Sequence, residues 1–186
     1  MYDFEENRRL VLDEINVSLG MISPVEFGAF LEELLKKRRI LVVAVGRVLI
    51  SMKAWVKRLY HLDLDINFVG SETEKPIGKG DFLIVASSSG ESKFPVEIAK
   101  IAKEKGACIA YLGCSPESSA AKLAEKHLFF TGRTKFAKPG EYNSIQPMSS
   151  LFEQQLYLLG DIIALCLMKI KKINEQELKN KHANLE

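Results

Sequence analysis

The stretch ILVVAV, from Ile40 to Val45, decides the fold class of this chain of 186 residues. It is short, continuous and rich in β-branched residues, which is typical of a strand buried on both faces of a parallel sheet. Similar runs follow at INFV (Ile66–Val69), DFLIVA (Asp81–Ala86), CIAYL (Cys108–Leu112) and HLFF (His127–Phe130). Five such runs predict a five-stranded parallel sheet.

Helical stretches separate most of these predicted strands. They are expected at Ile50–His61, Lys93–Lys105 and Pro116–Lys126, the last with Ser115 as N-cap and Pro116 as first helical residue. Alternating strands and helices predict right-handed crossovers, with helices on both faces of the sheet. We therefore expect an α/β fold, a flavodoxin-like three-layer αβα sandwich with strand order 2-1-3-4-5. The link between Val69 and Asp81 is too short for a full helix and is expected to be a loop.

Further helices flank this unit on both sides. The first two are expected at Glu5–Met21 and from Ser23, an N-cap followed by Pro24 and by Glu26 at capping-box spacing, to the KKRR cluster. After a long loop at Thr131–Pro147, an apolar helix at Met148–Lys172 and a short charged helix at Asn174–Ala183 are expected. The apolar helix predicts either a subunit interface or deep burial within the monomer. Without internal repeats, residues 1–186 are expected to form one domain.

Composition excludes several classes of partner. The 26 basic and 24 acidic residues nearly cancel, so no broad basic surface predicts binding to nucleic acid or to an anionic membrane. No apolar run reaches the roughly 18 residues that cross a bilayer, and no leader directs export, so we expect a cytoplasmic protein. Cys108, Cys114 and Cys166 have no CxxC spacing and are expected to be reduced core thiols.

Two loops are predicted to form a ligand site. In an open parallel sheet, ligands bind beyond the carboxyl ends of the strands, where the strand order reverses. Gly46–Leu49 follows the first strand and SSSGES (Ser87–Ser92) follows the third, so they should face each other across one crevice. Hydroxyls and the free N–H groups of a helix N-terminus suit a phosphate monoester. A P-loop lysine pattern is absent, which argues against a nucleoside triphosphate. The alternative is a polar turn with a helix cap.

The same motifs carry a family resemblance. SSSGES, followed by VEIAKIAKEKGA and combined with VGR (Val45–Arg47), resembles the phosphate loop of the sugar isomerase (SIS) domain family. Four further segments resemble its 6-phospho-3-hexuloisomerase branch, namely RLYHLD (Arg58–Asp63), SPESS (Ser115–Ser119), SIQPMSSLFEQ (Ser144–Gln154) and KHANLE (Lys181–Glu186). The match covers nearly the whole chain, and the last two segments are the most specific.

The resemblance implies an activity and a set of site residues. It implies interconversion of 3-hexulose 6-phosphate and fructose 6-phosphate through a cis-enediol(ate), within the ribulose monophosphate route of formaldehyde fixation. It also implies a homodimer or homotetramer that needs no metal or other cofactor. Ser87, Ser89 and Ser92, with Gly46 opposite them, match the phosphate-binding positions. Glu153 matches the glutamate expected to act as base, since one carboxylate can remove and return the proton.

Three other side chains are candidates for the chemistry. Arg47 directly follows the first strand, where its guanidinium would contact the phosphate or the enediolate oxygens. His61 and His182 are candidates for moving protons between substrate oxygens because imidazole titrates near neutral pH, and His182 is expected to reach the site of its own or a neighbouring subunit. The ordinary alternatives are a surface salt bridge for Arg47 and a first-turn glutamate for Glu153.

The chain departs from the family pattern at one important place. Where the hexuloisomerase pattern reads GRSG, this sequence has Gly46, Arg47, Val48 and Leu49. It thereby lacks a serine expected to hold the phosphate and a glycine that allows close approach; Ser88 and Ser149 also replace glycines. The change leaves two alternatives open: an isomerase for a different sugar phosphate, and a sugar-phosphate sensor that has lost turnover.

Overall fold

The computed structural model describes residues 3–36, 38–137, 139–182 and 184. In chain order its elements are α1 (Phe4–Gly20), α2 (Pro24–Leu35), β1 (Ile40–Val43), α3 (Gly46–Tyr60), β2 (Ile66–Phe68), β3 (Phe82–Ala86), α4 (Lys93–Glu104), β4 (Cys108–Gly113), α5 (Ser119–Leu123), β5 (Lys126–Phe129), α6 (Ser150–Lys171) and α7 (Glu175–Lys179).

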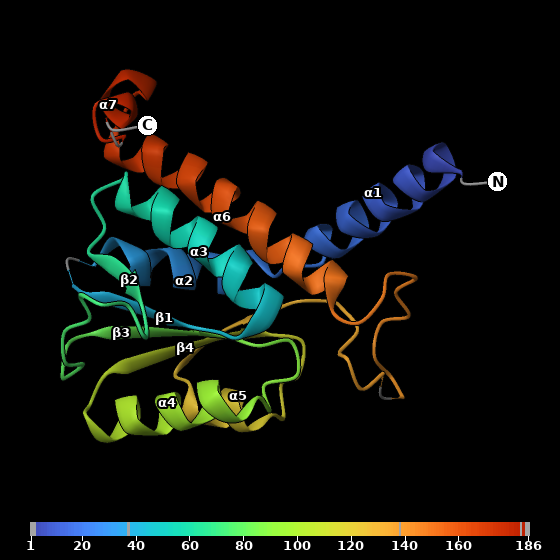
Figure 1. Ribbon diagram of the computed structural model, residues 1–186, viewed down its shortest axis with the longest axis horizontal. Coiled ribbons are helices and arrows are strands. Elements are labelled where there is room, and N and C mark those ends of the chain that lie inside the picture. Colours follow the sequence, from blue (N-terminus) through green and yellow to red (C-terminus); the bar gives the residue numbers. More distant parts are fainter. Residues whose placement is uncertain (1–2, 37, 138, 183, 185–186) are drawn as a thin grey trace.

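The five strands form one parallel sheet in the order β2-β1-β3-β4-β5, which confirms the predicted topology. Helices α4 and α5 cover one face, whereas α2, α3 and α6 cover the other, so the three layers are also confirmed (Figure 1). Because all strands run the same way, their carboxyl ends lie along a single edge of the sheet. The β1–α3 and β3–α4 connections meet at that edge, since β1 and β3 are neighbours.

The central strands β1, β3 and β4 are buried on both faces, as their continuous apolar runs require, whereas the edge strands β2 and β5 are only partly buried. On β1, Ile40 and Val42 pack into the core beneath α2, α3 and α6, and Leu41 and Val43 pack into the core beneath α4 and α5. All four residues are at most 2% exposed. At roughly 2 kcal/mol for each fully buried aliphatic side chain, this double burial is the main force that holds β1 at the centre of the sheet.

Two helix starts test the capping predictions. Ser23 caps α2 by accepting a hydrogen bond from the N–H of Glu26, as predicted, but the Glu26 carboxylate accepts one from the N–H of Phe129 instead of completing a capping box. The start predicted for α5 is wrong. Its cap is Ser118, because the N–H of Ser118 first turns back to the carbonyl of Ser115. The Ser115–Pro116 pair therefore lies in the turn before the helix.

The start of α3 also differs from the prediction. Gly46–Leu49, expected as loop, is the first turn of α3, which begins with Gly46 at a φ of +60°. This left-handed conformation is one that glycine adopts without a Cβ penalty, and it lets the chain change direction directly from strand to helix. The amino end of α3 is therefore brought to the carboxyl edge of the sheet.

Helix α6 carries apolar side chains on both its buried face and its exposed face. One face is buried against α3, where the indole N–H of Trp55 donates to the carbonyl of Leu156 over 2.5 Å. The opposite face exposes Tyr157, Leu158, Ile162 and Leu165, each at least 37% exposed. By length and composition α6 is apolar enough to cross a membrane, although no apolar run of that length was expected from the sequence. Half of its most apolar segment is buried inside the fold, and the core helix of a soluble protein passes the same test.

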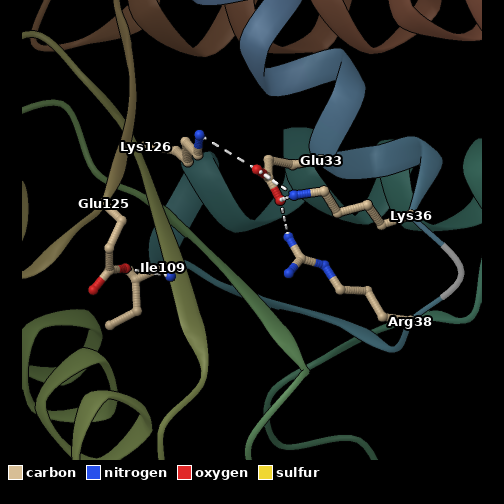
Figure 2. A network of polar contacts seen from close by, with 6 residues as sticks. All are labelled: Glu33, Lys36, Arg38, Ile109, Glu125 and Lys126. Carbon is tan, nitrogen blue, oxygen red and sulfur yellow. Dashed lines mark hydrogen bonds and ion pairs between the residues drawn. The ribbon is translucent and has the colours of Figure 1, made fainter.

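A network of charges fastens α2 to the amino edge of the sheet, opposite the edge described above. Glu33 of α2 is 4% exposed and pairs with Lys36, with Arg38 before β1 and with Lys126 of β5 (Figure 2). Burial by itself would raise the pKa of Glu33, but the three surrounding cations together lower it. The carboxylate is therefore held ionised.

The three cysteines are free and half-buried, and Cys108 and Cys114 pack at the margin of the core instead of within it. Burial of the Cys114 sulfur raises the pKa of its thiol to about 12, so it is protonated at neutral pH.

Candidate active site

A pocket of about 170 Å³ opens at the carboxyl edge of the sheet. The β1–α3 connection lines one side, the β3–α4 loop lines the other, and the long loop before α6 closes the third. The two connections thus face each other across one crevice, as predicted from the strand order. The lining residues are Val45, Gly46, Arg47, Val48, Ala86, Ser87, Ser88, Ser89, Ser92, Lys135, Ser149 and Glu153.

Three helices direct their N-termini at this pocket, and none of the three is capped by a side chain. Val45, Ser92 and Ser149 occupy the N-cap positions of α3, α4 and α6, and all three line the pocket. Elsewhere the chain caps its helices, with Asp3, Ser23, Ser118 and Asn174 accepting hydrogen bonds at α1, α2, α5 and α7. The first N–H groups of a helix need acceptors. A bound anion can supply them, and the positive ends of the helix dipoles favour it.

The β3–α4 loop adds hydroxyl groups to these N–H groups. Ser87 Oγ accepts from the N–H of Gly90 over 3.1 Å, and Ser89 Oγ accepts from the N–H of Glu91 over 3.3 Å. A hydroxyl that accepts from the backbone keeps its own proton, which Ser89 can donate to a ligand oxygen. The Ser87 hydroxyl donates to Ser92 Oγ over 3.5 Å and would turn this proton to the ligand. The 87–92 loop is therefore rigid and also rich in donors, which suits a phosphate.

Glu153 lies in the first turn of α6 and faces the same pocket. It is 8% exposed, and its backbone carbonyl accepts a hydrogen bond from Ser51 Oγ of α3 over 2.9 Å. Ser149 Oγ lies 3.3 Å from Glu153 Oε1. Within the described part of the chain, Oε2 accepts no hydrogen bond. The carboxylate is thus fixed in place while one of its oxygens is left without a donor.

Arg47 stands beside this carboxylate. Its Nη1 lies 3.2 Å from Glu153 Oε2, which is close enough for an ion pair although not aligned for a hydrogen bond, and 3.2 Å from Ser150 Oγ. The Arg47 side chain is 66% exposed, so it can turn toward a ligand. The structure therefore brings Arg47, Glu153, Gly46 and the loop serines together.

His61 and His182 lie elsewhere. Their rings pack together with centroids 5.6 Å apart, at the end of α3 opposite to Gly46. At a rise of about 1.5 Å per residue, this end is roughly 20 Å from the pocket. Helix α7 lies at the same remote end (Figure 1), where Lys181 also pairs with Asp63. Within one chain these histidines do not reach the pocket. Of the KHANLE segment, Ala183, Leu185 and Glu186 lie outside the described residues.

Sequence reasoning missed three residues of this region. Lys135 and Ser149 line the pocket, and Glu14 of α1 binds the loop before α6 through Ser144 Oγ, the N–H of Ile145 and Gln146 Nε2. The only available signal for Lys135 was its place in a long loop, since such loops often serve a site. Glu14 had no signal, because its partners are 130 or more residues away.

The departure from the GRSG pattern changes the lining of the pocket. Val48 lines it and is only 9% exposed, because its side chain also packs into the core beneath α3. Leu49 packs at the margin of the same core. This part of the wall is therefore hydrocarbon, and the hydroxyls of the pocket come from Ser87, Ser88, Ser89, Ser92 and Ser149.

Comparison with known proteins gives one consistent result. No family model matches the chain. The chain is 35% identical to 3-hexulose-6-phosphate isomerase of Bacillus subtilis strain 168 over 95% of both chains, and 31% identical to the Mycobacterium gastri protein of that name over 99% of this chain and 92% of the other. A crystal structure from Methanococcus jannaschii, for which a 3-hexulose-6-phosphate isomerase function has been inferred, shares the fold with a TM-score of 0.82 at 24% identity, covering 97% of this chain and 99% of that one. The chain belongs to the 3-hexulose-6-phosphate isomerase family.

Proposed function

We propose that this protein interconverts 3-hexulose 6-phosphate and fructose 6-phosphate. The observation that carries the proposal is Glu153, a buried carboxylate that pairs with Arg47 and whose Oε2 accepts no hydrogen bond from the described residues. It faces a loop of hydroxyls and three uncapped helix N-termini across one pocket. A phosphate held by the loop would place the sugar carbons of the same molecule against the carboxylate. This is the arrangement that an isomerase of a phosphorylated ketose needs.

The phosphate is held mainly by Ser87, Ser89 and Ser92, together with the N–H groups near Gly46. Apart from Arg47, which pairs with Glu153, the one cation among the lining residues is Lys135. It supplies the charge for a phosphate dianion. Because Val48 stands where the family pattern has a serine, the N–H groups and Lys135 contribute a larger share of the phosphate-binding energy than they would beside a serine hydroxyl.

Glu153 carries the proton between the two carbons. It removes the proton from C2 of 3-hexulose 6-phosphate, the C–H electron pair forms the C2–C3 double bond, and the C3 carbonyl becomes an enediolate oxygen stabilised by Arg47. A proton moves from the C2 hydroxyl to that oxygen, the C2 ketone forms, and Glu153 returns its proton to C3. No atom or electron is gained or lost overall. The same carboxylate serves both carbons because they are adjacent on one face.

The protein acts as one SIS domain over residues 1–186, in the cytoplasm, as a homodimer or homotetramer. The exposed apolar face of α6 supports assembly, since faces of this kind are usually covered by a subunit. Assembly would also give His182 a role if the remote end of α3 in one subunit approaches the pocket of another; His61, which is 4% exposed, would support the His182 ring there. There an imidazole would move the proton between O2 and O3.

The proposal is tested with fructose 6-phosphate in deuterated water. The reverse reaction removes the C3 proton, so we expect NMR to show deuterium at C3 of the sugar and the slow appearance of a 3-ketose. Binding without exchange or product would contradict the isomerase proposal and favour a sensor. Exchange only with another ketose phosphate would show that the Val48 wall selects a different substrate.

A further inference from the structure

Tyr111, a residue of β4, lies directly beneath the 87–92 loop. Its side chain is fully buried, and its hydroxyl donates to the carbonyl of Ser87 over 2.9 Å, with the carbonyl of Ser88 at 3.4 Å. The N–H of Cys114 donates to the Ser88 carbonyl over 2.9 Å. Two consecutive carbonyls of the loop are therefore held toward β4 from below.

Holding these carbonyls also fixes the direction of the N–H groups beside them. In a trans peptide the N–H points opposite to the C=O of the same unit, and no described peptide bond is cis. The N–H groups of Ser88 and Ser89 therefore point away from Tyr111, to the side on which both residues line the pocket. The other N–H groups nearby already have acceptors within the protein. That of Ser87 donates to the carbonyl of Leu112, that of Gly90 to Ser87, and that of Glu91 to Ser89 Oγ. For Ser88 and Ser89, no such bond is found among the described residues.

The fit between Tyr111 and the loop is tight. Gly113 passes so close that a Cβ there would lie 2.0 Å from the Tyr111 oxygen and 2.3 Å from the Ser87 carbonyl oxygen, so only glycine lets the phenol reach the loop. Burial raises the pKa of Tyr111 well above its ordinary value, so the hydroxyl stays protonated and remains a donor at neutral pH.

We propose that Tyr111 is a positioning residue for the phosphate site, because its hydroxyl sets the loop so that the N–H groups of Ser88 and Ser89 are presented to the ligand before it binds. The inference rests on the proposed phosphate-binding role of this loop. A preorganised pair of N–H donors avoids the cost of ordering the loop on binding. Tyr111 itself touches no ligand.

The test is Tyr111→Phe, which keeps the ring and removes only the hydroxyl. We expect KM for fructose 6-phosphate to rise about five- to tenfold, the size of one lost buried hydrogen bond, with less than about a twofold change in kcat. Ser18→Ala is the matched control, because Ser18 is also fully buried and donates to a backbone carbonyl, that of Ile15, but lies on α1. Ser18→Ala should leave KM unchanged even if it lowers the thermal stability of the protein as much as Tyr111→Phe does.

A second measurement uses NMR and begins with the wild-type protein. When inorganic phosphate is added to the wild-type protein, the amide proton signals of Ser88 and Ser89 should shift more than that of Gly90. In Tyr111→Phe, both shifts should shrink. An unchanged KM in a folded, active Tyr111→Phe protein, or wild-type Ser88 and Ser89 amides that ignore phosphate, would overturn the inference. Failure of the proposed function would instead appear as a wild-type protein without C3 exchange, whatever the amides do.

Discussion

At the scale of single residues, Ser89 shows how the phosphate loop is built. Its oxygen accepts from the N–H of Glu91, so its proton is left for the ligand. Ser89→Ala removes that donor, and a hydrogen bond to a charged group contributes about 1.5–3 kcal/mol. We expect KM for the sugar phosphate to rise by about tenfold or more, with binding of unphosphorylated fructose equally weak in both proteins. Equal affinity of the wild type for the two sugars would remove the basis for a phosphate site.

Val48 offers the opposite test, because it replaces a serine of the family pattern. Val48→Ser would place a hydroxyl at the wall of the pocket, and we expect KM to fall by up to about tenfold. The same change removes methyl groups from the core, so the free energy of unfolding should fall by roughly 2 kcal/mol. Enzyme kinetics and urea denaturation measure the two effects separately. A KM that rises would mean that the hydrocarbon wall contacts the substrate favourably.

Residues that belong to motifs could be predicted, and residues that act through long-range contacts could not. Gly46, Arg47, Ser87, Ser89, Ser92 and Glu153 all line one pocket, as their motifs predicted. His61 and His182 lie in segments of the family resemblance and titrate near neutral pH, but within one chain they pack against each other and do not reach the pocket. Tyr111 read only as a strand residue, since nothing local reveals that its hydroxyl meets a loop 24 residues earlier.

At the scale of elements, the Glu33 network holds α2 to the sheet and makes stability depend on pH. The pKa of Glu33 is lower in the folded protein than the value of about 4.3 in an unfolded chain. The contribution of ionised Glu33 to the free energy of unfolding is therefore fully present above the unfolded pKa and is lost as pH falls through the folded pKa. Glu33→Gln should lower the free energy of unfolding at pH 7 by about 1.5–3 kcal/mol, because it removes the carboxylate that pairs with Arg38, whose side chain is 15% exposed, and with the more exposed Lys36 and Lys126.

Denaturation of both proteins from pH 7 to pH 3 checks this expectation. The difference between wild type and Glu33→Gln should shrink below about pH 4. Glu97→Gln, which breaks an exposed pair with Lys100 on α4, should change stability by less than about 1 kcal/mol. A Glu33 effect as small as that of Glu97, or one that does not vary with pH, would contradict the account.

The predicted boundaries of elements were wrong where the same residues favour both a turn and a helix start. The existence of every strand was predictable, because each coincides with a short apolar run, although the edge strands β2 and β5 are only partly buried. Helix α3 begins four residues earlier than predicted. Glycine usually disfavours a helix, and the sequence does not show that Gly46 adopts the left-handed φ from which this helix starts. Helix α5 begins later, because Pro116 fits a turn as well as a first helical position.

At the scale of the whole molecule, α6 has one apolar face too many for a monomer. We expect sedimentation to show a dimer or tetramer at micromolar concentration. Leu165→Glu places a charge in the middle of the exposed face, at a residue that is 59% exposed, and should shift the protein toward monomer without unfolding it. Lys100→Glu, on α4 at the other face of the sheet, is the control and should not change the assembly. A wild-type monomer would contradict the interface and leave His182 without a site to reach.

The most direct test of the central claim, that Glu153 carries the proton, is Glu153→Gln. This change keeps the shape and removes the basicity, and general acid–base groups contribute about 10²- to 10⁴-fold in rate. We expect kcat and deuterium exchange at C3 of fructose 6-phosphate to fall together by at least about 100-fold, while the affinity for the sugar changes little. Glu104→Gln, on the exposed surface of α4, should retain full activity. If Glu153→Gln keeps more than about a tenth of the wild-type rate, or loses turnover but keeps exchange, another group is the base.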